Sequence, residues 1–145
     1  MLPYLIESRL PVVRLFELDD DRFQLLETGN IGPFLPGYGY LLVERDLAEF
    51  LSEHEVGRIV LKEAVLFDRP SGQEYRTHVR IQVRQYFKSE QINDLDLNGL
   101  RLLTMNDEYY FASPELKERL EQSPFDYLSF SEGLEGFAGA QTLPR

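Results

Sequence analysis

Two stretches in the middle of the chain have the hydrophobic pattern of β-strands. Residues 59–67 (IVLKEAVLF) are rich in β-branched and aromatic side chains. Residues 75–87 (YRTHVRIQVRQYF) alternate largely apolar odd positions with polar or basic even positions. The turn-forming segment DRPSGQE lies between them, so the pair predicts a hairpin with a longer loop. The alternation predicts that one face of the second strand is buried and the other is in water.

In residues 44–57, apolar side chains are spaced three and four residues apart. In residues 44–57 (ERDLAEFLSEHEVG), Leu47, Phe50 and Leu51 recur at this spacing among acidic positions. The pattern is typical of a short amphipathic helix, which we expect to end at Gly57.

A second helix has a well-defined start. Ser113 supplies a hydroxyl N-cap, Pro114 occupies the first helical position, and Glu115 places an acid in the first turn. We expect this helix to run through Glu121, because Pro124 bars its continuation.

The remaining segments complete the predicted fold. Residues 29–40 (GNIGPFLPGYGY) contain glycines and prolines that predict a loop without a regular element. Residues 131–145 have no apolar period and predict a loose C-terminal tail. Further strands are predicted at 12–18, before an acidic turn at Asp19 to Asp21, at 100–104 and 108–112, turned at Asn106 and Asp107, and at 127–130. The sum is one α+β domain over residues 1–130, with an antiparallel sheet of about four to seven strands and two or three short helices.

Composition narrows the possible functions. The 145 residues include 15 Lys and Arg against 25 Asp and Glu, a net charge of -10, and no cysteine. The missing cysteines exclude disulfides, thiolate nucleophiles and cysteine-ligated metals. The acidic balance argues against binding to nucleic acid or anionic lipid. The chain starts without a basic leader and contains no apolar run of about 18 residues, so we expect a cytoplasmic protein that does not contact membranes.

No catalytic constellation stands out. The chain contains no GxSxG, SxxK, GxxxxGK or GxGxxG motif. The acids at 19–21 lack the layout of a calcium loop, and His54, in a row of acids, has no second histidine spaced to join it. We therefore predict no catalytic residue, no cofactor and no metal site.

Basic side chains gather in one segment of this acidic chain. Arg76, Arg80, Arg84 and Lys88 are four residues apart, so on one strand they would share a face. In one interpretation they pair with carboxylates of neighbouring strands or cover the sheet with their alkyl stems. In the other they bind an acidic partner or an anion, and Arg80 and Arg84 matter most.

Three aromatic residues in the glycine-rich segment are also candidates for partner binding. Phe34, Tyr38 and Tyr40 could anchor a protein interface, where aromatic and arginine side chains dominate the energetics. Alternatively, they fold back onto the core. The predicted partner-binding set is therefore Arg76, Arg80, Arg84, Phe34, Tyr38 and Tyr40.

The capped helix near the end of the chain contains Ser113, Glu115, Leu116, Lys117, Leu120 and Glu121, and the predicted strand after it spans Tyr127 to Phe130. In these residues the last third of the chain resembles the C-terminal part of small immunity proteins of bacterial polymorphic-toxin and type VI secretion systems. The likeness covers about 60 residues and transfers no functional residue. It implies a non-enzymatic cytoplasmic protein that binds and neutralises one cognate toxin.

Three functions remain open at this point. The first is the immunity protein, with a protein toxin as partner and a homodimer as a possible state. The second is a small enzyme or ligand-binding domain that holds an anionic substrate on the basic sheet face. The third is an adaptor or scaffold subunit.

Overall fold

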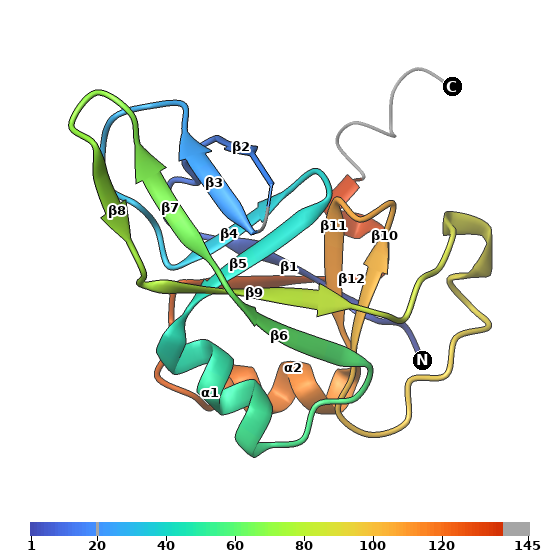
Figure 1. Ribbon diagram of the computed structural model, residues 1–145. Coiled ribbons are helices and arrows are strands. Elements are labelled where there is room, and N and C mark those ends of the chain that lie inside the picture. Colours follow the sequence, from blue (N-terminus) through green and yellow to red (C-terminus); the bar gives the residue numbers. More distant parts are fainter. Residues whose placement is uncertain (20, 138–145) are drawn as a thin grey trace.

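The computed structural model describes residues 1–19 and 21–137, in which twelve strands form three four-stranded sheets (Figure 1). The terminal sheet has the order β10-β11-β1-β12, the central sheet β4-β5-β9-β6 and the outer sheet β2-β3-β7-β8. Neighbouring strands are antiparallel except for β3 and β7. The strands are β1 (Tyr4–Ser8), β2 (Leu15–Glu17), β3 (Arg22–Leu25), β4 (Phe34–Gly37), β5 (Tyr40–Glu44), β6 (Ile59–Glu63), β7 (Val65–Asp68), β8 (Gln73–Tyr75), β9 (His78–Val83), β10 (Leu102–Met105), β11 (Tyr109–Ala112) and β12 (Leu128–Glu132).

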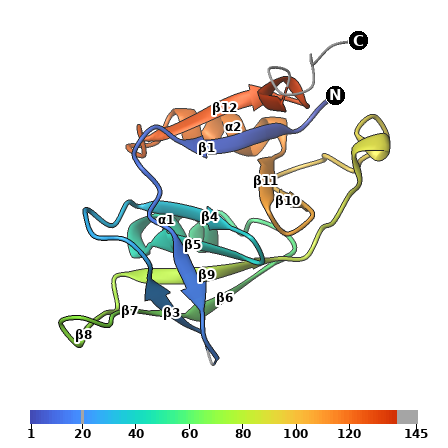
Figure 2. The same ribbon diagram turned by 90° about the horizontal axis from the view of Figure 1, so that it is seen from above.

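Two α-helices accompany the sheets, α1 (Arg45–Glu53) and α2 (Pro114–Glu121), with short 3-10 helices at Ser89–Gln91 and Glu135–Phe137. Seen from above, the terminal sheet and α2 form one side of the molecule, and the central and outer sheets follow beneath it (Figure 2). The predicted α+β class is confirmed, but the strands are more numerous and are divided among three sheets. No helix in the described part of the chain is long and apolar enough to cross a membrane.

The central and outer sheets separate at one buried residue. Ala64, only 1% exposed, separates β6 of the central sheet from β7 of the outer sheet. The hairpin predicted from 59–67 and 75–87 is therefore split. β6 pairs with β9, with Leu61 opposite Ile81, whereas β7 pairs with β8, with Leu66 opposite Tyr75.

The glycine- and proline-rich segment was predicted to be a loop without a regular element. In the structure, β4 and the start of β5 form a hairpin there. Gly37 lies opposite Tyr40, and Gly39 closes the turn with φ of 85°. A Cβ at position 37 would lie 2.0 Å from the Tyr40 ring, so only glycine leaves room for it. Pro36 is tolerated because β4 is an edge strand of its sheet, where one side of the backbone needs no strand partner.

Strand β1 was not predicted from the sequence, because its pattern does not alternate. It lies between β11 and β12, and both Leu5 and Ile6 are buried at 3% exposure. Leu5 packs in a cluster with Phe111, whereas Ile6 packs with the larger core around α1 and α2. A strand covered on both faces has no polar side to reveal it.

The end of the domain also differs from the prediction. β12 includes residues 131 and 132, and Leu134 and Phe137 pack against the cluster that contains Phe111. Residues 131–137 thus belong to the folded domain rather than to a loose tail. The rest of the predicted tail, residues 138–145, lies outside the described residues, as does Asp20 of the acidic turn.

Local signals in the last third of the sequence are confirmed by the structure. Asn106 and Asp107 adopt left-handed φ angles of 63° and 51° in the turn between β10 and β11. Helix α2 begins after Ser113, whose Oγ accepts from the Leu116 amide at 3.4 Å. The same oxygen donates to the Gly99 carbonyl at 2.7 Å, so this cap also fixes the loop before β10.

The Ser113 cap gives a prediction for stability. Ser113→Ala should lower the free energy of unfolding by about 1–2 kcal/mol, because a buried cap and its hydrogen bonds are lost. Ser52→Ala, at an exposed position of α1, is the matched control and should change it by about 0.5 kcal/mol or less. Urea unfolding followed by circular dichroism measures both, and equal effects would contradict the role of the cap.

Candidate functional site

Arg80, in the middle of β9, is held inside the molecule. Its Nη1 donates to Asp21 Oδ1 at 2.6 Å and to Glu17 Oε2 at 2.8 Å, and Nη2 donates to the Gly39 carbonyl at 2.9 Å. Burial alone would lower the pKa of this guanidinium, but the hydrogen bonds and charges of Asp21 and Glu17 raise it. The guanidinium lies 5.6 Å from the centre of the Phe23 ring. Of the two interpretations of the basic residues, Arg80 thus follows the one in which it pairs internally.

The Arg80 contacts connect the outer sheet to the β4–β5 turn of the central sheet, and this turn also contacts the terminal sheet. Glu17 lies in β2 of the outer sheet, whereas Gly39 forms the turn between β4 and β5 of the central sheet. The Gly39 amide donates to the Asp107 carbonyl at 2.7 Å, and Asp107 belongs to the β10–β11 turn of the terminal sheet. The Tyr110 hydroxyl donates to the same carbonyl at 3.1 Å. The tip of the β4–β5 hairpin is therefore fixed from two sides.

The other predicted basic residues do not form a continuous stripe. The strand breaks between Tyr75 and His78, so Arg76 lies outside both β8 and β9. Arg76 is 67% exposed and lies 3.5 Å from a carboxylate oxygen of Glu74. Arg84 follows the end of β9. Its side chain forms no ion pair with a described residue and makes a long contact of 3.5 Å to Gln82.

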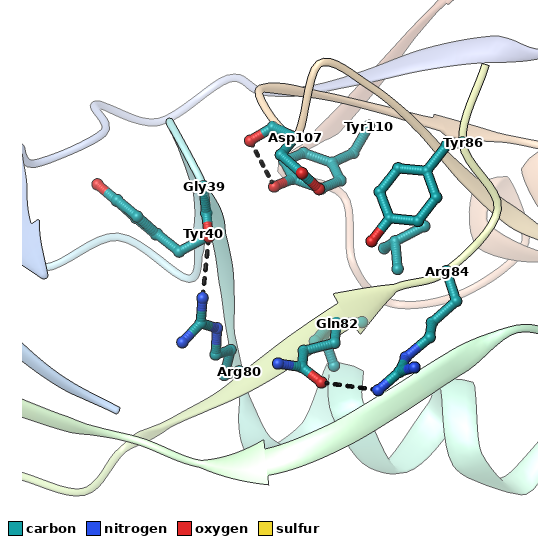
Figure 3. A pocket seen from close by; sticks show the side chains of 10 residues that line it. Gly39, Tyr40, Arg80, Gln82, Arg84, Tyr86, Asp107 and Tyr110 are labelled. Atoms are coloured by element: carbon teal, nitrogen blue, oxygen red, sulfur yellow. Dashed lines mark hydrogen bonds between the residues drawn. The ribbon is translucent and has the colours of Figure 1, made fainter. Parts of the chain in front are cut away.

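A cavity of about 230 Å³ lies over this part of the central sheet (Figure 3). The Tyr86 hydroxyl points into it, and the Arg84 and Gln82 side chains lie side by side at its wall. Arg80 also lines the cavity, but both of its Nη atoms already have acceptors. Two arginines line the cavity, and Arg84 is the one that forms no ion pair with a described residue. A single unpaired guanidinium gives little support to an anion-binding surface.

His78 is buried, although the alternation had placed it on the wet face. Its side chain is covered by the segment that precedes β4, and the residue is 1% exposed. The Nε2–H donates to the Gly32 carbonyl at 2.8 Å, and Nδ1 accepts from the Thr77 hydroxyl at 2.8 Å. Burial lowers the pKa of His78, so the imidazole is a neutral structural group away from the cavity.

The three aromatic residues predicted to bind a partner differ in burial. Phe34 is 3% exposed and packs in the main core, and Tyr40 is 8% exposed and packs with Phe23. Neither is available to a partner, because the hairpin turns their side chains inward. Tyr38 is 79% exposed at the hairpin tip.

Further exposed apolar side chains surround Tyr38. Phe16 of β2 is 57% exposed and Leu26, after β3, is 51% exposed. Together with Val12 and Pro36 they line one hollow of about 450 Å³ beside Tyr38. We call this set, Val12, Phe16, Leu26, Pro36 and Tyr38, the Tyr38 surface.

Phe16 and Leu26 were not among the predicted partner-binding residues, although their positions in the apolar pattern could have indicated their exposure. Val13 and Leu15 are buried, so a two-residue period places Phe16 on the opposite face of β2. Leu25 and Leu26 are adjacent in an extended segment, so they cannot both face the same core. An apolar residue out of phase with the buried face either packs in a second cluster, as Leu5 and Ile6 of β1 do, or is exposed, as Phe16 and Leu26 are.

The Arg80 contacts give a prediction for stability. Arg80→Ala should lower the free energy of unfolding by about 1–3 kcal/mol, because two partly buried carboxylates lose their cation. Arg84→Ala is the control and should change it by about 0.5 kcal/mol or less. Urea denaturation measures both variants, and a loss for Arg84→Ala as large as for Arg80→Ala would contradict this assignment.

The buried His78 predicts a pH dependence of stability. Its pKa is below the usual 6.5 in the folded chain, so the unfolded chain binds the additional proton. The free energy of unfolding should therefore fall as the pH drops below about 6.5, by at most about 1.4 kcal/mol per pH unit. Urea unfolding at several pH values, in a His54→Gln chain where His78 is the remaining histidine, measures this slope. A flat profile between pH 7.5 and 5.5 would contradict the burial of a neutral ring.

Neither a metal site in the described residues nor a match to a known protein indicates the function. Among residues 1–19 and 21–137, no three His, Asp or Glu side chains are grouped so that they could hold a metal ion. Comparisons of the chain with protein-family models, curated proteins and solved structures found no match. The likeness to immunity proteins stays a prediction that depends on the residues of α2 and β12.

Proposed function

We propose that this chain is a non-enzymatic immunity-type protein that binds and neutralises a cognate bacterial toxin in the cytoplasm. The observation that carries the proposal is the Tyr38 surface, where exposed aromatic and aliphatic side chains surround one hollow. Large apolar side chains gathered on the outside of a domain are typical of protein interaction sites.

The energetics of the Tyr38 surface fit a protein partner. Phe16, Leu26 and Tyr38 are each more than half exposed. Burying a large apolar side chain contributes about 1.5–3 kcal/mol, so covering these three would contribute several kcal/mol to a complex. Aromatic side chains also offer a large contact area at a small loss of side-chain entropy.

The hydrogen bonds that fix the hairpin tip also support a role of Tyr38 in binding a protein partner. Gly39, next to Tyr38, accepts a hydrogen bond from Arg80 and donates one to Asp107. A contact residue that is already fixed loses less conformational entropy on binding, which raises affinity. In this proposal Arg80 positions Tyr38 and does not itself contact the partner.

The small-ligand alternative depends on the cavity beside Arg84. One unpaired guanidinium and the Tyr86 hydroxyl offer few contacts to an anionic substrate, and the carboxylate of Asp107, which also lines the cavity, would repel it. An adaptor would use the same Tyr38 surface, and only the identity of its partner separates it from an immunity protein.

Tyr38 and Tyr86 provide a matched pair of exposed tyrosines for the test, at 79% and 62% exposure. A toxin domain encoded beside the gene for this chain would be the binding partner to measure, by calorimetry and by survival of cells that express it. Tyr38→Ala and Phe16→Ala should each weaken binding about 10- to 100-fold and reduce survival. Tyr86→Ala should change affinity less than about threefold.

Two outcomes would overturn the proposal. Continued killing by the toxin, with no complex on a sizing column, would exclude an immunity function. Loss of binding in Tyr86→Ala with normal binding in Tyr38→Ala would move the contact to the Arg84 cavity and away from the Tyr38 surface.

A further inference from the structure

A second hollow lies on the other side of Tyr38. It measures about 260 Å³ and is formed where β1, the β4–β5 turn and the β10–β11 hairpin meet. Pro36 and Tyr38 belong to both hollows, so the exposed tyrosine stands between them. The walls of the second hollow include Glu7, Glu108, Tyr109 and Tyr110.

Two carboxylates of this second hollow are left without a cation. Glu7, exposed on β1, and Glu108, half-buried beside the β10–β11 turn, form no ion pair with a described residue. Burial raises the pKa of the neighbouring Tyr109, and the charge of the Glu108 carboxylate and hydrogen bonding to it raise this pKa further. The Glu108 carboxylate therefore acts electrostatically at the wall of the hollow.

The charges around the first hollow are different, because they are already paired. Glu17 bonds to Arg80, and Arg14 lies 3.3 Å from Glu27. What this first hollow offers a partner is apolar surface from Val12 and Phe16. Tyr38 thus separates an apolar hollow from an acidic one.

We propose that the partner of the Tyr38 surface places a lysine or arginine side chain between Glu7 and Glu108, and an apolar side chain in the hollow beside Phe16. This inference rests on the proposed function and adds the chemistry of the partner. A guanidinium or ammonium in the second hollow would meet two carboxylates that form no ion pair with a described residue. It would also lie within reach of the Tyr38 ring, which attracts cations through its π face.

Charge complementarity selects a basic partner over a second copy of this chain. In a symmetric dimer the same patch lies on both sides of the axis. Such a dimer through the Tyr38 surface would offer Glu7 and Glu108 no unpaired cation, because Arg14, the basic residue among those that line the two hollows, already pairs with Glu27. The missing cation disfavours self-association here, whereas a basic protein is attracted both by this site and by the net charge of -10.

The cation site can be tested without the toxin, with methylguanidinium as the probe and propionate as its opposite in charge. In NMR titrations of the ¹⁵N-labelled protein, methylguanidinium should shift the amides of Glu7, Glu108 and Tyr38 in a saturable manner, and propionate should not. The variant Glu7→Gln/Glu108→Gln should weaken the apparent affinity at least fivefold. Glu49→Gln/Glu53→Gln, an equal change of charge at two exposed acids of α1, should leave it unchanged.

The results that would overturn the inference are specific. Shifts spread evenly over the acidic surface, or equal loss in the two double variants, would show that methylguanidinium senses only net charge. Normal folding of each variant is checked by its amide spectrum.

A second arm uses the toxin and separates this inference from the proposed function. If the toxin binds, Glu7→Gln/Glu108→Gln should weaken the complex about 10-fold at low salt and less at high salt, because exposed charges are screened. A toxin that binds both chains equally would overturn the inference and leave the function standing. Saturable methylguanidinium binding without any toxin complex would overturn the function and leave the cation site standing.

Discussion

The guanidinium of Arg80 is the contact on which the arrangement of the candidate surface depends. One cation lies between two carboxylates, Glu17 and Asp21, and also donates to the backbone of Gly39. With 13% of its side chain exposed, it is screened by water less than a surface ion pair is. Its removal would leave two acids facing each other beside β9, in a chain that already carries excess negative charge. Arg80 therefore adds a polar connection between the outer sheet and the hairpin tip to the apolar packing of Phe23 against Tyr40.

This arrangement explains how a short hairpin can present an exposed aromatic residue without losing its shape. The Tyr38 side chain is exposed to water, yet the next residue, Gly39, is hydrogen-bonded to Arg80 and to Asp107 of the terminal sheet. Binding residues are commonly found on loops that a rigid scaffold holds in place. Here the scaffold is three sheets that meet at one turn, and the two hollows beside Tyr38 lie along the lines where they meet.

Local rules predicted the parts of the fold that depend on neighbours in sequence. The N-cap at Ser113, the turn at Asn106 and Asp107, and the burial of Val79 and Ile81 on alternate positions are all present. Parts that depend on distant contacts were not predictable in this way. The hairpin from β4 to β5 requires β9 beside it, and β1 is recognisable only once it lies between β11 and β12. For the same reason, the arginine stripe indicated a charged face but not the carboxylates that neutralise Arg80, which lie about 60 positions earlier in the chain.

Hydrogen exchange at one amide tests most directly whether Arg80 fixes the hairpin tip. Gly39 and Gly72 both lie in tight turns with positive φ, and each amide donates to one backbone carbonyl. Only the Gly39 turn is bonded by Arg80, so Arg80→Lys should lower the protection of the Gly39 amide about 10-fold or more and leave Gly72 unchanged. Unchanged protection at Gly39, in a variant that remains folded, would contradict the account.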